Sequence, residues 1–293
     1  METLQSLQGK IESTEDLHSV VRTMKSLAAV TIRQFEEAAA AVEKYARTVE
    51  MGLRIALREG PDTRLRARAA DGRRVGAMVF GTDQGMCGAI NETVVNQVGD
   101  ALRDFDGDIH RLVAVGERAA GRLAEEGNPP DGVLEAPGSV SGVGRVVQEL
   151  LFDLEKWEAE AAVDHVFLFY NRSLGGASYA PQAVHLLPLD RDWLDRLRRR
   201  PWEGRCLPMV SGPPGETFSA LGREYLFATL FRALADALAA ENASRLAAMQ
   251  GAEGKVAERL DDLRREYHRH RQQAITEELL DIAAGFEALR ESG

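Results

Sequence analysis

Proline is absent from the first 60 residues and from every position after Pro214. Because proline breaks the interior of a helix, its absence leaves both ends of the chain free to form long, uninterrupted helices. Aromatic residues are also scarce, at 6%, whereas charged residues reach 28%. A charged content this high is typical of long helices with solvated faces.

Cysteine is nearly absent, since the chain has only Cys87 and Cys206 and no Cys-x-x-Cys motif. A disulfide scaffold or a zinc site is therefore not expected, and a reducing compartment is the default. The formal net charge of −10 argues against nucleic acid as the main partner. Basic runs at 64–68, 73–74 and 196–200 are interpreted as solvated faces and linkers.

No apolar stretch approaches the roughly 20 residues that cross a bilayer. The N-terminus also lacks the basic segment followed by an apolar one that marks a secretory signal. We therefore expect a membrane link only through another subunit.

The N-terminal segment predicts one helix over about 3–58, which would be ~80 Å long. Gly60-Pro61-Asp62 is typical of a turn and is expected to end this helix. Apolar or small residues recur at alternating steps of four and three, which predicts a seam for a neighbouring helix at Leu17, Val21, Met24, Ala28, Thr31, Phe35, Ala38, Val42, Tyr45, Val49, Gly52 and Ala56.

The C-terminal segment predicts a second helix over about 217–289, ~110 Å long if unbroken. Its apolar steps of three and four with charged flanks indicate a coiled coil. Gly251 and Gly254 each weaken the helix by roughly 1 kcal/mol relative to alanine. They mark a bend, a break or a close approach of another helix.

The two terminal helices should pair antiparallel, because an inserted domain makes residues 58 and 217 neighbours. Helix one then covers helix two as far as about residue 272. Beyond that point an apolar stripe has no partner within the chain, and such a stripe predicts a partner surface. Its members are Ile275, Leu279, Ile282, Phe286 and Leu289.

Between the helices, short apolar runs at 75–80, 111–115, 163–170 and 180–187 predict buried strands. They alternate with helical segments at 89–102, 116–126 and 143–160, and turn or linker chemistry occurs at 128–132 and 211–215. This order predicts a mostly parallel sheet covered on both faces. The expected domains are an N-terminal coiled-coil helix at 1–58, an α/β domain with linkers at 59–215, and a C-terminal coiled-coil helix at 216–293.

No motif specifies an active site. The Walker A pattern is absent, and Gly116–Gly121 lacks the middle glycine of a dinucleotide-binding turn. His268 and His270 are two residues apart, whereas ligands on one helical face are three or four apart. Cys87 has no histidine nearby in sequence to act as its base. We expect no catalytic residue, no cofactor and no metal in this chain.

Four segments, in the right order over nearly the whole chain, together resemble the gamma subunit family of F-type ATP synthases. Residues 240–250 resemble its ASE-AAR-AM-A segment, and 271–282 its RQAAIT-E-E-I run. Residues 82–91 resemble its S-DRGLCGGLN loop, and 23–29 its K-AMK-VAA segment. The resemblance implies terminal helices paired as a stalk around an inserted Rossmann-like α/β domain.

Two departures refine this resemblance. The usual basic start and TQKIT segment are replaced by residues 14–22, and Gly-Ala-Glu-Gly stands where asparagine and aspartate are common. These features are similar to the alternate gamma subunit of N-type ATPases. The chloroplast-type regulatory cysteine insertion is missing, so that form of thiol control is not expected.

The resemblance implies a central rotor stalk that couples proton or sodium flow through a membrane c-ring to ATP synthesis or hydrolysis. Its partners would be the alpha and beta subunits, whose beta subunits carry the catalysis, together with the epsilon subunit and the c-ring. The chain would be a non-catalytic, peripheral subunit at the cytoplasmic face of a bacterial inner membrane.

The same resemblance implies contact residues. Those toward the alpha/beta hexamer would be Met24, Lys25, Arg271, Gln272 and Thr276, with the apolar Ile275, Leu279, Ile282 and Phe286. Those at the foot, on the c-ring or epsilon side, would be Asp83, Gln84, Gly85, Cys87 and Asn91.

Two other classes of protein stay open. One is a coiled-coil scaffold or adaptor with a small α/β head, which predicts homo-oligomers. The other is a nucleotide-binding α/β protein, which predicts that the purified chain binds ATP or NAD. Co-purification with alpha and beta subunits distinguishes the rotor from both.

Overall fold

The computed structural model describes residues 3–59, 72–105, 107–176, 178–202, 208–209 and 212–291. Residue contacts divide the chain into two compact units. Unit 1 comprises 1–27 and 247–293, and unit 2 comprises 28–246. Helix α1 (Leu4–Glu59) and helix α6 (Pro214–Glu291) each contribute to both units.

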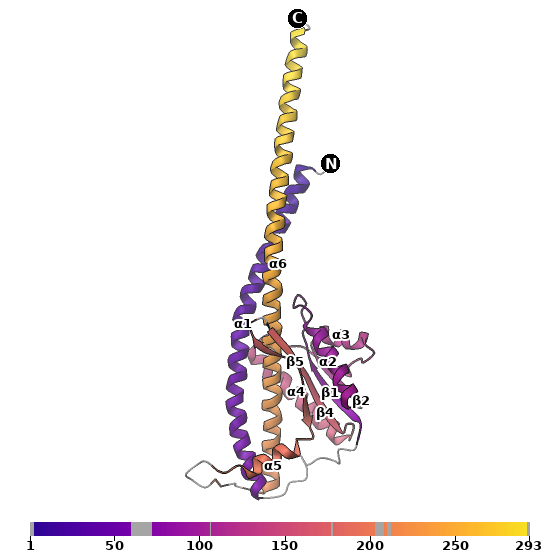
Figure 1. Ribbon diagram of the computed structural model, residues 1–293, viewed down its shortest axis with the longest axis vertical. Helices are drawn as coiled ribbons and strands as arrows, with labels where there is room; N and C mark the ends of the chain where they lie inside the picture. The colour runs from indigo at the N-terminus through magenta and orange to yellow at the C-terminus, as the bar shows by residue number, and fades with distance from the viewer. Residues whose placement is uncertain are drawn as a thin grey trace. The chain divides into compact units, whose positions relative to one another are not determined.

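Unit 2 contains a five-stranded sheet with the order β3-β2-β1-β4-β5 (Figure 1). Strands β1, β2, β3 and β4 run parallel, whereas β5 is antiparallel to β4. The mostly parallel sheet predicted from the sequence is therefore confirmed, although β3 falls where only a turn was expected. The strand bounds are Arg74–Phe80 (β1), Asp108–Val115 (β2), Gly132–Leu134 (β3), His165–Gly175 (β4) and Ser178–Leu187 (β5).

Both faces of the sheet are covered by helices. Successive residues of a strand point to opposite faces, so one strand contributes to two cores. On β1, Met78 and Phe80 pack into a core with α4 (Val140–Ala159) and α6. The intervening Ala77 and Val79 pack into a second core, which includes residues of α2 (Ile90–Phe105) and α3 (Glu117–Glu125). The continuous apolar run of β1 in the sequence reflects this burial on two sides.

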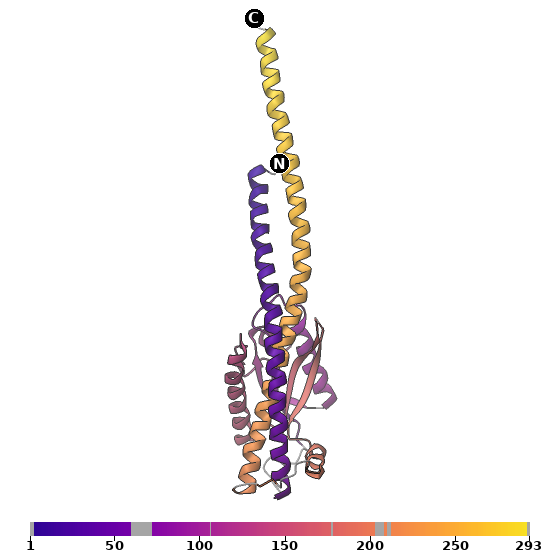
Figure 2. The same ribbon diagram turned by 90° about the vertical axis from the view of Figure 1, so that its left-hand side faces the viewer.

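A third core joins the last turns of α1 to the first turns of α6 through a short helix, α5 (Arg191–Arg199; Figure 2). Its centre includes Leu53 of α1, Leu197 of α5 and Phe218 of α6. The Asp190 side chain caps α5 by accepting a hydrogen bond from the Asp192 amide at 2.9 Å. The basic run at 196–200, interpreted from the sequence as solvated, is therefore the outer face of a helix with a buried side.

In unit 1, the first turns of α1 pack antiparallel against α6. Lys25 donates a hydrogen bond to Glu253, and the Arg264 Nη2 atom donates to Glu15 Oε1 at 2.6 Å. The buried apolar side chains of this unit are Leu7, Val21, Met249, Leu260 and Leu263. Long terminal helices that pair in this sense, together with the α/β sheet, confirm the predicted fold class.

The seam of α1 follows the predicted one only in part. Every seventh residue from Leu7 to Ala56 is buried or half-buried, as predicted for the members from Val21 onward. In the other predicted register Leu17 is 51% and Tyr45 42% exposed, and the remaining four members are half-buried. Ala39 and Leu53 lie outside both registers and are buried, so the contact face of α1 includes more than one residue per heptad.

Among the described residues, no helix is both long enough and apolar enough to cross a bilayer. The same residues contain no cluster of three or more histidine, cysteine, aspartate or glutamate side chains placed to hold a metal ion.

Candidate functional site

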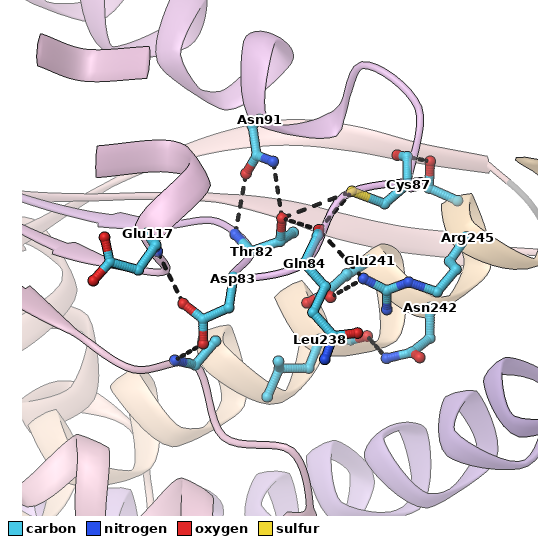
Figure 3. Close-up of polar contacts among 12 residues, drawn as sticks. Thr82, Asp83, Gln84, Cys87, Asn91, Glu117, Leu238, Glu241, Asn242 and Arg245 are labelled. Carbon is cyan, nitrogen blue, oxygen red and sulfur yellow. Dashed lines mark hydrogen bonds and ion pairs between the residues drawn. The ribbon is translucent and has the colours of Figure 1, made fainter. Parts of the chain in front are cut away.

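The loop that follows β1 lies against α6 in unit 2 (Figure 3). Strand β1 is parallel to β4, and β5, antiparallel to β4, ends at the core that contains α5. The carboxyl end of β1 therefore points away from α5, and the loop lies at the opposite end of the sheet.

Asn91, in the first turn of α2, closes this loop. Its Oδ1 atom accepts a hydrogen bond from the Thr82 amide at 3.0 Å, and its Nδ2 atom donates to Thr82 Oγ1 at 2.9 Å. The Thr82 hydroxyl in turn donates to the Gln84 carbonyl at 2.9 Å. All three contacts are local, so these side chains shape the loop.

Asp83 ties the end of β1 to two other segments. Its Oδ1 atom accepts a hydrogen bond from the amide of Glu117 at the start of α3, at 2.9 Å. Its Oδ2 atom accepts from the Ala136 amide, just after β3, at 2.8 Å. Both carboxylate oxygens are thus engaged with the backbone of the same unit.

On the α6 side, three polar residues are more than nine-tenths buried: Glu241, Ser244 and Arg245. The Ser244 hydroxyl donates to the Cys87 carbonyl at 2.6 Å. The Arg245 Nη2 atom donates to Glu241 at 2.6 Å and to the Gln84 carbonyl at 3.5 Å. We call the residues Thr82–Asn91, Glu241, Ser244 and Arg245 the loop clamp.

Burial sets the electrostatics of the loop clamp. It raises the pKa of Glu241, whereas the ion pair with Arg245 lowers it. Burial likewise raises the pKa of the Cys87 thiol, which disfavours the thiolate that nucleophilic chemistry needs. The loop clamp therefore holds the end of the sheet against α6. Its geometry does not resemble that of a catalytic site.

Gly85 and Gly88 have different roles in this loop. Gly88 adopts a φ of +64°, and a Cβ atom there would lie 3.1 Å from Ser244 Oγ. Gly85 has room for a side chain, with only the Arg118 guanidinium between 3.7 and 3.9 Å of such a Cβ atom. The close approach of loop and helix therefore depends on Gly88, which was not singled out from the sequence.

The sequence assigns Asp83, Gln84, Gly85, Cys87 and Asn91 to the foot. The loop that contains them lies beside α6 residues 241–245, at the end of the sheet opposite α5. Their partner outside the chain stays a prediction, whereas their contacts within the chain are those of the loop clamp.

Sequence reasoning missed Glu241, Ser244 and Arg245 as site residues. The signal that could have found them is the segment 240–250, where charged and hydroxyl residues interrupt a run of alanines on an otherwise apolar helix. A buried helix rarely carries such residues unless they have hydrogen-bond partners.

The second candidate surface is the part of α6 beyond its pairing with α1 in unit 1. Every described side chain from Arg271 to Ala284 is exposed. Coverage thus ends where length matching predicted. Four of these side chains are large and apolar, namely Ile275 (47% exposed), Leu279 (61%), Leu280 (63%) and Ile282 (64%). Ile275, Leu279 and Ile282 follow one another at steps of four and three on one face of the helix, and we call these three residues the apolar stripe. The side chains of Phe286 and Leu289, also predicted here, lie outside the described residues.

The polar residues predicted at this surface are exposed as well. Arg271 and Gln272 both face solvent, and the Thr276 hydroxyl donates to the Gln272 carbonyl at 2.8 Å. Lys25, also predicted as a partner contact, forms an ion pair with Glu253 within unit 1 and lowers the pKa of Glu253. Its contact with the hexamer stays a prediction. Met24 is half-buried in the same unit.

The two glycines of α6 neither break the helix nor admit a close neighbour. α6 is continuous through both positions. A Cβ atom built on Gly251 or Gly254 has no other atom within 4 Å. Of the three interpretations drawn from the sequence, a helix break and a close approach are therefore excluded.

Comparisons with known proteins agree with this architecture. Residues 3–289 match the family model described as ATP synthase. An ATP synthase gamma chain of Synechococcus sp. (strain PCC 6716) is 30% identical, with 99% of this chain and 100% of that protein aligned. The gamma chain of Thermosynechococcus vestitus is 29% identical over the same shares. The rotor of the Euglena gracilis mitochondrial ATP synthase shares the fold, with a TM-score of 0.62 at 15% identity, covering 93% of this chain and 98% of that one.

Proposed function

This chain belongs to the family of ATP synthase gamma chains, and we propose that it is the central rotor stalk subunit of a rotary ATP synthase or ATPase. The observation that carries the proposal is the family match, which extends over both terminal helices and the sheet. The partners in this proposal are an alpha/beta hexamer, an epsilon subunit and a membrane c-ring. The N-type assignment and the cytoplasmic face of a bacterial inner membrane are finer parts of the same proposal.

In this mechanism the chain performs no chemistry of its own. Proton or sodium flow turns the ring, the chain turns with it, and its asymmetric helices meet each beta subunit differently at each angle. Rotation then biases the beta subunits between conformations, because a rotor angle that binds one nucleotide state better shifts the equilibrium toward that state.

The apolar stripe is the proposed surface for the hexamer. Ile275, Leu279 and Ile282 are between 47% and 64% exposed, and no described residue of unit 1 covers them. Burying a leucine or isoleucine side chain contributes about 1.5–3 kcal/mol. Apolar side chains of the hexamer around this segment would bury the stripe through non-directional contacts. Such contacts do not fix one rotational position, as directional hydrogen bonds would.

The loop clamp is proposed to transmit torque between the sheet and α6. Its buried contacts, Ser244 to the Cys87 carbonyl and Arg245 to the Gln84 carbonyl, join the end of a central strand to the helix. These contacts lie within unit 2, and the foot contact expected for residues of the same loop stays a separate part of the proposal.

The test is a charge placed in the apolar stripe. We expect the double variant Leu279→Asp/Ile282→Asp to lose at least about tenfold in affinity for an alpha/beta hexamer, because two apolar contacts are replaced by buried charges. The matched control is Glu278→Gln, on the same exposed turn. Unfolding of the free chain should be unchanged in both, since these side chains are solvated.

The readouts are hexamer binding and ion-driven ATP synthesis by the reassembled enzyme. If the double variant supports binding and coupled synthesis as well as the control does, the stripe is not the hexamer surface. Homo-oligomers without hexamer binding would favour the scaffold alternative. Binding of ATP or NAD by the purified chain would favour the nucleotide-binding alternative.

A further inference from the structure

Two histidines form a hydrogen-bonded pair at the end of the sheet nearest α5. His165 begins β4 and is 4% exposed, and His185 lies near the end of β5. His165 Nδ1 and His185 Nε2 are 3.0 Å apart. Neither residue has a role in the loop clamp or the apolar stripe.

The pair is enclosed by two phenylalanines from different elements. The ring of Phe105, the last residue of α2, lies 4.7 Å from that of His165 in an edge-to-face arrangement. The same ring lies 5.0 Å from Phe167 of β4, and Phe167 lies 4.8 Å from His185. These four rings pack together where the end of α2 and the end of β5 meet β4, and they add to the ladder that pairs β5 with β4.

One proton is shared across the pair, so one ring nitrogen donates and the other accepts. The other nitrogen of His165, Nε2, is buried and has no hydrogen-bond partner.

A further proton therefore has no favourable place to go. Taken up by His185, it makes His185 Nε2 a donor, so His165 Nδ1 must accept and the proton of His165 must lie on Nε2. There it is a buried N–H donor without an acceptor. This cost weakens the packing of the four rings.

The charged groups around the pair are engaged elsewhere. Asp164 accepts hydrogen bonds from Arg74 of β1, at 2.9 Å from Nε and 2.7 Å from Nη2. Asp190, beyond β5, accepts from the amide of Asp192 at the start of α5. On α2, Arg103 and Asp100 form an exposed ion pair with each other. Each of these three carboxylates is thus engaged by a partner other than the histidine pair.

We infer that His165 and His185 form an acid-sensitive joint, in which proton uptake loosens the end of α2 and the end of β5 from β4. This inference is independent of the proposed rotor function. It rests on the geometry of the pair, on its aromatic enclosure and on the unpartnered nitrogen.

The direction of the pH dependence agrees with this geometry. Burial lowers the pKa of His185, and the neighbouring His165 lowers it further, whereas Leu187 and Asp190 raise it. His185 binds protons more weakly in the folded chain than in the unfolded chain. The stability that its neutral form contributes is therefore present above pH 6.5, the ordinary pKa of histidine. This contribution is lost as the pH falls below 6.5.

The test is amide hydrogen exchange of the full chain at pH 7.5 and pH 5.5, corrected for intrinsic rates. In the wild type we expect peptides spanning the end of α2 and 165–187 to lose at least about fivefold in protection at pH 5.5. Peptides from the loop clamp serve as the internal reference. The variant His185→Gln, which keeps a hydrogen-bonding side chain but cannot take up a proton, should lose this local pH dependence.

Two further variants complete the test. His185→Phe extends the aromatic cluster and should also be insensitive to pH, so the inference survives if His185→Gln fails to fold. His110→Gln is the matched control on β2, where the side chain is exposed, and it should behave as the wild type does. If His185→Gln and His185→Phe keep the wild-type loss of protection at pH 5.5, or if the wild type shows none, the joint does not exist.

Discussion

Replacing Gly251 and Gly254 by alanine should stabilise the chain. Both residues lie in the interior of α6, where glycine costs about 1 kcal/mol relative to alanine. A Cβ atom at either position meets no other atom within 4 Å, so nothing offsets the gain. We expect about 1 kcal/mol from each substitution and about 2 kcal/mol from both.

The gain should appear in two measurements. The midpoint of thermal unfolding should rise by about 2–4 °C for each alanine. Hydrogen exchange in residues 247–263 should slow by up to about 30-fold in the double variant, which is the factor that 2 kcal/mol represents. The Lys25–Glu253 ion pair lies between the two sites on the helix and should persist, because neither glycine contacts it.

Gly52→Ala in α1 is the matched control. A Cβ atom at Gly52 would lie 3.1 Å from both Cδ atoms of Leu221, so the gain in helix propensity is opposed by crowding. We expect Gly52→Ala to gain less than either α6 substitution, or to destabilise. If Gly251→Ala and Gly254→Ala leave stability unchanged or lower it, the open surroundings of these glycines have been misinterpreted.

Three other substitutions test the packing of unit 2. Arg245→Met should cost about 3–5 kcal/mol in urea unfolding because it leaves the Glu241 carboxylate buried and unpaired, and adding Glu241→Met should restore most of the loss. Gly116→Ala should cost at least about 2 kcal/mol, because Gly116 has a φ of +102° and a Cβ atom there would lie 2.6–2.8 Å from the Thr82 backbone; thermal unfolding measures this. The ion pair with Arg74 lowers the pKa of Asp164 from its ordinary value of 3.8 to about 2. The stability that this ion pair contributes is therefore present above pH 3.8 and is lost as the pH falls toward 2. Asp164→Asn should remove that part of the acid dependence of the thermal midpoint between pH 5 and pH 2.

The centre of the sheet was largely predictable from the sequence, because strands buried on both faces appear as short apolar runs. The run at 75–80 became β1 (Arg74–Phe80), and the run at 111–115 became the second half of β2 (Asp108–Val115). The edge strand β5 was predicted at 180–187 although it is mostly half-buried, whereas the edge strand β3, with three residues, is too short to show a pattern. Helix α5 was missed because its composition is dominated by arginine, and only its two buried leucines record its contact with the core.

The loop clamp was less accessible to sequence reasoning. Its loop and its α6 residues are separated by about 160 positions, for example 161 between Gln84 and Arg245. The motifs in both segments were visible, yet no local pattern pairs them. Such pairing is decided by the sheet order, which brings the carboxyl end of β1 to α6, and by Gly88, which permits the close approach.

The position of β1 in the sheet determines how a load entering at the loop clamp is shared. β1 is the central strand, bonded to β2 along one edge and to β4 along the other. A pull along its axis stretches the hydrogen bonds of both ladders at the same time, in shear, so none of them can fail alone. An edge strand pulled from its end would peel away one bond after another. The loop clamp is therefore attached to the strand that has the greatest resistance to being pulled out of the sheet.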